Sequence, residues 1–316
     1  MRWAGYVLVA LGAAFFLEQV GYRFSHDYAV WKREALVRSR EQGGWFHGVF
    51  RWVPLDAWAS PPEPSGVHIS DARGSEETAY ARKRLSHLRP LRDDLYEALV
   101  NRSGDFSDMV GRRTSLDEVT LLEPKKPDKV FDRAVILLLV GPDGTTAGGG
   151  LREEIGAVLG TGVSCALARV DYIKAALDAV GTLRGPSWAP RRMVAVCAYG
   201  KEAGYLALAL ANRPDGIVAA AVVSPVGVIQ EGRWSKADYP SVLFAASAAD
   251  LPGVRHNALA WSAHCRARTT EPGKGEILGM VTPGGREERH FDVKLKTYVY
   301  AFLLESLKKA GASSLE

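Results

Sequence analysis

The chain has little cysteine and no long run of a single charge. Its 316 residues include three cysteines, which are too few and too widely spaced for a disulfide framework or a zinc site. Cys165 and Cys197 lie in apolar, strand-like runs, where we expect each thiol to behave as a small hydrophobic group. The 40 basic and 36 acidic residues are interspersed and leave a net charge of +4, so the composition gives little support to nucleic-acid binding.

The glycine signatures of nucleotide-binding proteins are also missing. Three consecutive glycines, residues 148–150, are not followed by the Gly-Lys-Ser or Gly-Lys-Thr that a P-loop requires. The Gly-x-Gly-x-x-Gly pattern of dinucleotide-binding domains does not occur. We therefore predict neither a cofactor nor a metal site.

The longest uncharged apolar segment, WAGYVLVALGAAFFL, occupies residues 3–17. As a helix, it covers ~22 Å of the ~30 Å hydrocarbon core, and extension to residue 22 reaches about the full width. Three readings stay open: an uncleaved anchor, a cleaved signal peptide and a buried helix. We predict that residues 1–22 are a membrane anchor or signal segment, which places the protein at a membrane, in the cell envelope or outside the cell. Basic residues lie on both sides of the segment, so its orientation is not specified.

Residues 23–128 are interpreted as an N-terminal extension that is partly helical. The stretch SEETAYARKRLSHLRPLRDDLYEALVNRS, residues 75–103, has a helical rhythm that is interrupted at Pro90. Two proline-rich stretches, ASPPEPSG at 59–66 and EPKKPDK at 123–129, have the composition of linkers. We place the main domain at residues 129–316.

In that domain, apolar runs alternate with helical patterns across short loops. The run RAVILLLVG at 133–141 is continuously aliphatic and ends in glycine, as expected of a strand covered on both faces. The predicted strands are residues 133–141, 163–170, 193–199, 216–225, 241–247 and 275–285. The alternation predicts an α/β fold with a mostly parallel central sheet and helices on both faces.

Sites in such sheets form beyond the carboxyl ends of the strands. The first predicted strand ends in Gly141-Pro142-Asp143-Gly144, the third in the turn GKEAG at 200–204, and the fifth in ASAADLPG, which contains Asp250. The sixth is followed by GGREERHFDV, which contains His290. A turn, then an acid, then a histidine is the chain order of the α/β-hydrolase fold.

On these motifs the chain resembles the α/β-hydrolase family, in particular its esterase, dienelactone-hydrolase and prolyl-oligopeptidase-like branch. The resemblance covers about residues 129–307. APRRMVAVCAYGKEAGYLALALANRP is similar to the family's strand, nucleophile elbow and helix, and VILLLVGPDG to its oxyanion strand and loop. The resemblance implies that Asp250 and His290 are the acid and the histidine of a catalytic pair, and that Gly141 and Asp143 belong to the oxyanion loop.

The elbow departs from the family at its critical position. The turn contains no serine, cysteine or aspartate. If Gly200 and Gly204 are the two flanking small residues of a Gly-x-Ser-x-Gly elbow, Glu202 takes the nucleophile position, whereas the downstream rhythm AGYLALAL puts Lys201 there. Neither side chain can replace serine, and both also fit an ordinary charged first turn of a helix. Pro142 has no N–H, which weakens the oxyanion loop as well.

Three functions remain open. The first is a membrane-associated α/β-hydrolase-fold protein that has lost serine hydrolysis and binds or scaffolds a small molecule or a protein partner. The second is an active ester or acyl hydrolase that uses His290 and Asp250 with a non-standard nucleophile; Ser224 and Ser247 lie at strand ends but have no elbow around them. The third is an envelope protein that binds a partner through residues 23–128.

Overall fold

We analysed a computed structural model of the chain, which describes ten segments. They are residues 70–101, 106–144, 150–185, 192–211, 216–226, 240–248, 250, 252–268, 275–282 and 293–313. The predicted membrane segment at 1–22, His290 and the extension up to residue 69 lie outside them. Among the described residues, no helix combines the length and the apolar character needed to cross a membrane.

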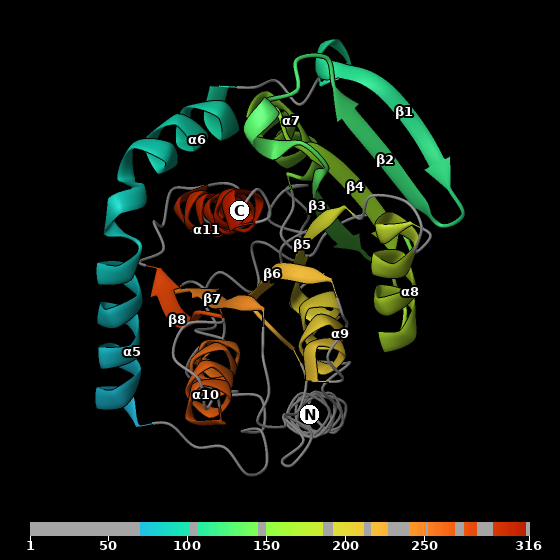
Figure 1. Cartoon of the computed structure of the whole chain (residues 1–316). Helices are drawn as coiled ribbons and strands as arrows, with labels where there is room; N and C mark the ends of the chain where they lie inside the picture. Colours follow the sequence, from blue (N-terminus) through green and yellow to red (C-terminus); the bar gives the residue numbers. More distant parts are fainter. Residues whose placement is uncertain are drawn as a thin grey trace, which may run out of the picture.

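The core of the protein is an eight-stranded sheet (Figure 1). Its strands are β1 (Val110–Leu116), β2 (Val119–Pro124), β3 (Ala134–Val140), β4 (Ser164–Arg169), β5 (Met193–Tyr199), β6 (Ile217–Val223), β7 (Ser241–Ser247) and β8 (Ile277–Thr282). The spatial order is β1-β2-β4-β3-β5-β6-β7-β8. β1 and β2 pair antiparallel with each other, and β2 pairs antiparallel with β4, whereas all other pairs are parallel.

Burial explains which strands the sequence revealed. Every residue of β3 is buried, so β3 reads as a continuous aliphatic run, and the six predicted strands are confirmed as β3 to β8. The hairpin β1–β2 was not predicted. β1 lies at the edge of the sheet and has no buried residue, and its sequence VGRRTSL is therefore polar.

Helices cover both faces of the sheet, as predicted. Their bounds are α5 (Asp71–Arg84), α6 (Arg89–Asn101), α7 (Leu151–Gly160), α8 (Ile173–Arg184), α9 (Gly200–Ala211), α10 (Pro252–Arg268) and α11 (Val293–Ser313), with 3₁₀ turns η1 (Ser86–Leu88), η2 (Ser107–Met109) and η3 (Lys129–Phe131). α6, α7 and α11 share one core cluster with the sheet, and α8, α9 and α10 share the other. Figure 1 shows these two layers on either side of the strands.

The predicted interruption near Pro90 is confirmed as a break between two helices. α5 ends at Arg84, η1 follows, and α6 begins at Arg89. Pro90 thus lies in the first turn of α6, where the N–H that proline lacks would have no partner within the helix. Leu85, Leu88 and the apolar side of α6 are buried against the sheet and α11.

α5 covers the exposed edge of β8, the last strand of the sheet. The backbone N–H of Val281 donates to the Thr78 hydroxyl at 3.2 Å, and the Val281 carbonyl accepts from the Arg82 guanidinium at 3.0 Å. Both unpaired backbone groups of an edge residue are thus satisfied by side chains of one helix. Such covering prevents an edge from pairing with another chain.

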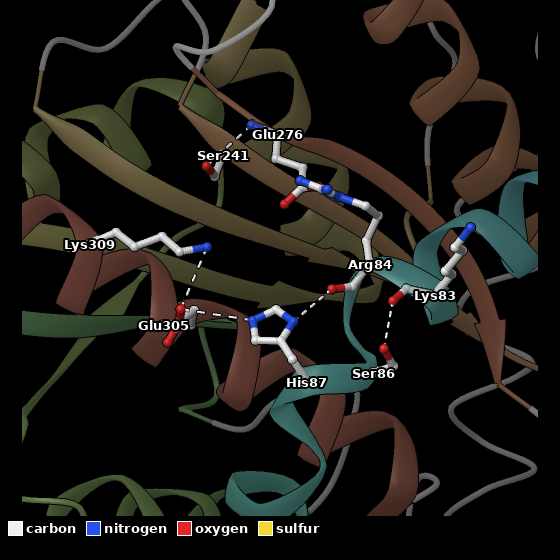
Figure 2. Close-up of polar contacts among 8 residues, drawn as sticks. All are labelled: Lys83, Arg84, Ser86, His87, Ser241, Glu276, Glu305 and Lys309. Carbon is white, nitrogen blue, oxygen red and sulfur yellow. Dashed lines mark hydrogen bonds and ion pairs between the residues drawn. The ribbon is translucent and has the colours of Figure 1, made fainter.

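The carboxyl end of α5 is also held at the opposite end of the strands (Figure 2). Arg84 forms an ion pair with Glu276, directly before β8, and the His87 Nδ1–H donates to the Arg84 carbonyl at 2.9 Å. The His87 Nε2 lies 3.9 Å from Glu305 of α11. These contacts are exposed, and each contributes only modestly to stability. Together they tie α5 and η1 to β8 and to α11.

We predict that replacing Thr78 with valine lowers the free energy of unfolding by about 1 kcal/mol, because the Val281 N–H loses its acceptor at a half-buried edge. The measurement is urea unfolding, with sedimentation velocity to detect self-association through the uncovered edge. Thr78→Ser is the matched control, because it keeps the hydroxyl and should behave like the wild type. Equal stability of the valine and serine variants would show that the contact is unimportant.

Candidate functional site

The carboxyl ends of the central strands meet at one edge of the sheet. Tyr199, the last residue of β5, is paired in register with Val223 of β6, and Val223 is paired with Ala245 of β7. The residues that follow these strands are therefore neighbours. The register brings together the turn after β5, Ser224 after β6 and Asp250 after β7, at the place where α/β sheets bind ligands.

The strand-to-helix turn after β5 is made by Gly200. This residue has a φ of 61°, in the left-handed region, and it is also the first residue of α9. Its carbonyl accepts a hydrogen bond from the Val226 N–H at 3.0 Å, which holds the loop after β6 against the turn. Glycine adopts this conformation without the steric penalty that a Cβ introduces.

The sequence left open whether Lys201 or Glu202 takes the nucleophile position. Both residues follow the left-handed Gly200 and lie in the first turn of α9. Lys201 is exposed, and its ammonium lies 5.8 Å from the centre of the Tyr205 ring, one helical turn further on. Glu202 is buried, with 8% of its surface exposed. An acidic residue in the first turn of a helix is favourably placed for the helix dipole.

Asp250 lies in the turn after β7 and is 3% exposed. Its Oδ2 accepts the Ser224 hydroxyl at 2.5 Å and the Ser247 N–H at 2.9 Å. The Asp250 carbonyl in turn accepts the Arg255 guanidinium from the start of α10. These bonds fix the carboxylate at the end of β7, as buried polar groups require.

Ser224 is the partner of Asp250 that the sequence did not reveal. It is fully buried and has a φ of 51°, an uncommon conformation for a residue with a Cβ. Its N–H donates to the Ala245 carbonyl at 2.7 Å, while its hydroxyl donates to Asp250. Ser224 therefore joins the ends of β6 and β7. Residues held in such strained backbone conformations cluster at functional sites.

The loop after β3 forms a tight turn. The Gly144 N–H donates to the Gly141 carbonyl at 2.8 Å, and Gly144 has a φ of 77°. Gly141 is buried and Asp143 is exposed. Pro142 between them has no N–H to donate. Residues 145–149 and His290 lie outside the described residues, so the predicted pairing of His290 with Asp250 stays a prediction.

A second buried polar cluster lies beside the turn, on the α11 side of the sheet. Glu154, in the first turn of α7, is fully buried, and its Oε1 lies 2.6 Å from the Lys296 ammonium of α11. Its Oε2 accepts the Tyr199 hydroxyl at 2.9 Å and also the Tyr300 hydroxyl. This cluster was not predicted from the sequence. The two consecutive acids, Glu153 and Glu154, do not reveal which one is buried.

Burial shifts the protonation of the groups around this carboxylate. Removal from water raises the pKa of Tyr199 and of Tyr300, and the negative charge of Glu154 raises both further. The pKa values of Cys165 and Cys197 are raised for the same two reasons. Both thiols are fully buried in β4 and β5, which confirms their prediction as small hydrophobic groups.

The turn after β5 contains none of the usual nucleophiles, serine, threonine or cysteine. Residues 199–204 read Tyr-Gly-Lys-Glu-Ala-Gly and include no hydroxyl or thiol other than the Tyr199 phenol, which is bonded to Glu154. Within the described segments, histidine, cysteine and acidic side chains form no group of three or more that could hold a metal ion.

The sheet order, the turn after β5 and the acid after β7 define the class of this protein: it has the α/β-hydrolase fold. No family model matches the chain, and no curated protein matches it.

Solved structures similar to the chain include oligopeptidase B from Trypanosoma brucei, at 12% identity and a TM-score of 0.44 over 62% of this chain and 37% of that chain. A post-proline cleaving enzyme from Rickettsia typhi matches at 12% identity and a TM-score of 0.43, over 65% and 38%. Thermogutta terrifontis esterase 2 matches at 16% identity and a TM-score of 0.42, over 62% and 92%. The chain thus spans less than two fifths of the length of the two peptidases. Likenesses of this extent carry no information on activity.

We predict that the protein loses stability as the pH rises above about 8.5 and again above about 10, the ordinary pKa values of cysteine and tyrosine. The raised pKa values of Cys197 and Tyr300 in the folded state mean that the unfolded chain releases these protons first, so that alkaline pH favours unfolding. Each group contributes a slope of up to about 1.4 kcal/mol per pH unit.

The check is the free energy of unfolding as a function of pH for the wild type and for Tyr300→Phe, which should have a shallower slope above pH 10. Leu303→Ala is the control, because it removes a fully buried side chain of α11 that does not titrate. It should lower stability by about 2–5 kcal/mol and leave the slope unchanged. An unchanged slope in Tyr300→Phe would contradict the explanation.

Two substitutions separate the hydrogen bond that Ser224 donates to Asp250 from its left-handed backbone conformation. Ser224→Ala removes the hydrogen bond to Asp250 and keeps the left-handed strain, whereas Ser224→Gly removes both. We expect alanine to lower the free energy of unfolding by about 1–3 kcal/mol, because the buried carboxylate loses a donor. Glycine should be about 1 kcal/mol less harmful than alanine. Thermal and urea unfolding measure both, and an alanine variant at least as stable as the glycine variant would be inconsistent with strain at this residue.

Proposed function

We propose that this α/β-hydrolase-fold protein has lost serine hydrolysis and acts by binding or scaffolding, held at a membrane by residues 1–22. The observation that carries the proposal is the left-handed glycine at the turn after β5. In a nucleophile elbow, the sharp turn between strand and helix presents the attacking side chain at the top of the sheet. Gly200 makes this turn and has no side chain to present.

The neighbouring side chains do not replace a nucleophile. Lys201 is exposed and lies over the Tyr205 ring, and Glu202 is buried in the first turn of α9. A glutamate carboxylate would also place its attacking oxygen about 1 Å away from that of a shorter side chain, an error that can reduce the rate ~10²-fold. Both residues fit the charged first turn of a helix better than they fit catalysis.

The serines at the strand ends are equally unsuited to attack a substrate. Ser224 is fully buried and donates its hydroxyl to Asp250. Ser247 is 4% exposed and donates its N–H to the same carboxylate. A hydroxyl that a substrate cannot reach does not form an acyl intermediate, so these residues support a structural role for the acid turn.

An active hydrolase is the second candidate, and the resemblance to α/β-hydrolases, which implies that Asp250 is the catalytic acid, supports it. Its buried carboxylate follows β7 and is fixed by two donors. If His290 pairs with it, the pair can still serve as a general base. Such an enzyme needs a nucleophile from elsewhere, or a water molecule activated by the histidine. The ligand in either case is an unidentified small molecule or protein.

The two candidates are separated by a fluorophosphonate probe and by turnover of p-nitrophenyl acetate, measured on the full chain. We expect no serine labelling, and turnover no faster than the rate measured with His290→Ala. Labelling or turnover that disappears in His290→Ala would establish the active hydrolase instead.

Gly200→Ser provides the matched gain-of-function variant. A serine at the left-handed position costs about 1 kcal/mol of stability but restores a hydroxyl at the turn. We expect this variant to gain fluorophosphonate labelling that is lost again in Gly200→Ser/His290→Ala. Without that gain, the loss of function would extend beyond the nucleophile to the pair formed by Asp250 and His290.

A further inference from the structure

We propose that Glu154 is a positioning residue that fixes the turn after β5 and the first turn of α11 to the start of α7. It thereby holds the carboxyl end of β5 and the amino ends of α7 and α11 in one relative position. The proposal does not depend on whether the protein hydrolyses anything, because a binding site at this edge needs the same three elements in place.

The contacts of Glu154 join the ends of three elements: the start of α7, the end of β5 and the start of α11. Glu154 belongs to the first turn of α7, directly after the loop that follows β3, and its N–H donates to the Gly150 carbonyl at 3.1 Å. Tyr199, which donates to its carboxylate, directly precedes the left-handed Gly200. Lys296, which forms the ion pair, lies in the first turn of α11.

The cluster places charged groups in the core, where their removal from water costs free energy. Glu154 is fully buried and Lys296 is 3% exposed, so both charges have lost their water. Replacement of such a pair by apolar side chains of similar volume is often neutral or stabilising, whereas removal of one partner alone is strongly destabilising. Stability therefore does not explain a charged pair here. A geometric requirement does, because an ion pair with two phenol donors accepts one arrangement of its elements.

Gly150 adds a steric constraint to the same point. It precedes α7 with a φ of 61°, and a Cβ at this residue would stand 3.0 Å from the Lys296 ammonium. The backbone of the residue before α7 thus lies close to the ion pair, and a side chain at this residue would crowd the Lys296 ammonium. The start of α7 and the start of α11 are fitted to each other at this contact.

The test measures position separately from stability. Nitroxide labels on cysteines introduced at Arg152 of α7 and Lys294 of α11, both exposed, report the distance between the two helix starts by pulsed electron resonance. The three native cysteines are buried and should not react in the folded protein. The wild-type background should give a single narrow distance distribution.

The decisive variant is Glu154→Met/Lys296→Met, which removes both charges and keeps an apolar core. We expect its midpoint of thermal unfolding to stay close to that of the wild type while the distance distribution broadens at least about twofold, because apolar contacts are not directional. A stable double variant with a distribution as narrow as that of the wild type would overturn the proposal.

Two further variants decide the question if the double variant fails to fold. Tyr300→Phe removes only one hydroxyl donor from Glu154, and it should broaden the distribution measurably. Leu303→Ala, on the same helix, lowers stability but removes no polar group of the cluster, and it should leave the distribution narrow. A narrow distribution in Tyr300→Phe, or equal broadening in Leu303→Ala, would refute a positioning role for Glu154.

Discussion

The reversal of the chain at Gly200 is the constraint on which this edge of the molecule depends. β5 lies at the centre of a parallel sheet, and the chain must leave it and begin α9 at the next residue. Only a left-handed backbone makes so sharp a turn, and glycine adopts it without a Cβ clash. The Gly200 carbonyl also receives the Val226 N–H, so the loop after β6 is placed by the same turn.

Two buried polar networks flank this turn. On one side, the Asp250 carboxylate joins the ends of β6 and β7 through Ser224 and the Ser247 N–H. On the other side, the Glu154 carboxylate joins α7, β5 and α11. The two core clusters on the faces of the sheet are mainly apolar, and hydrophobic packing is not directional. The two carboxylates fix the relative positions of the elements they join. Each accepts several donors in one geometry, and a buried polar group must keep its partners.

The described segments between residues 70 and 128 are packed onto the same sheet. β1 and β2 extend it antiparallel beyond β4, and α5 covers the edge at β8. One edge of the sheet is thus covered by α5, whereas the other edge is the polar strand β1, and both elements precede the predicted main domain. Edge strands need such protection because their free N–H and carbonyl groups pair readily with other chains.

The sequence by itself determined the elements that are buried on both faces. Runs such as AVILLLV are typical of strands covered on both faces, so β3 to β8 and the chain order of turn and acid were readable. β1 was not readable, because an exposed edge strand carries the polar residues of a loop. Only the tertiary structure decided which polar groups meet. Ser224 is 26 residues from Asp250, and Tyr300 is 146 residues from Glu154. Strand register and helix packing bring such partners together, and neither leaves a local pattern in the chain.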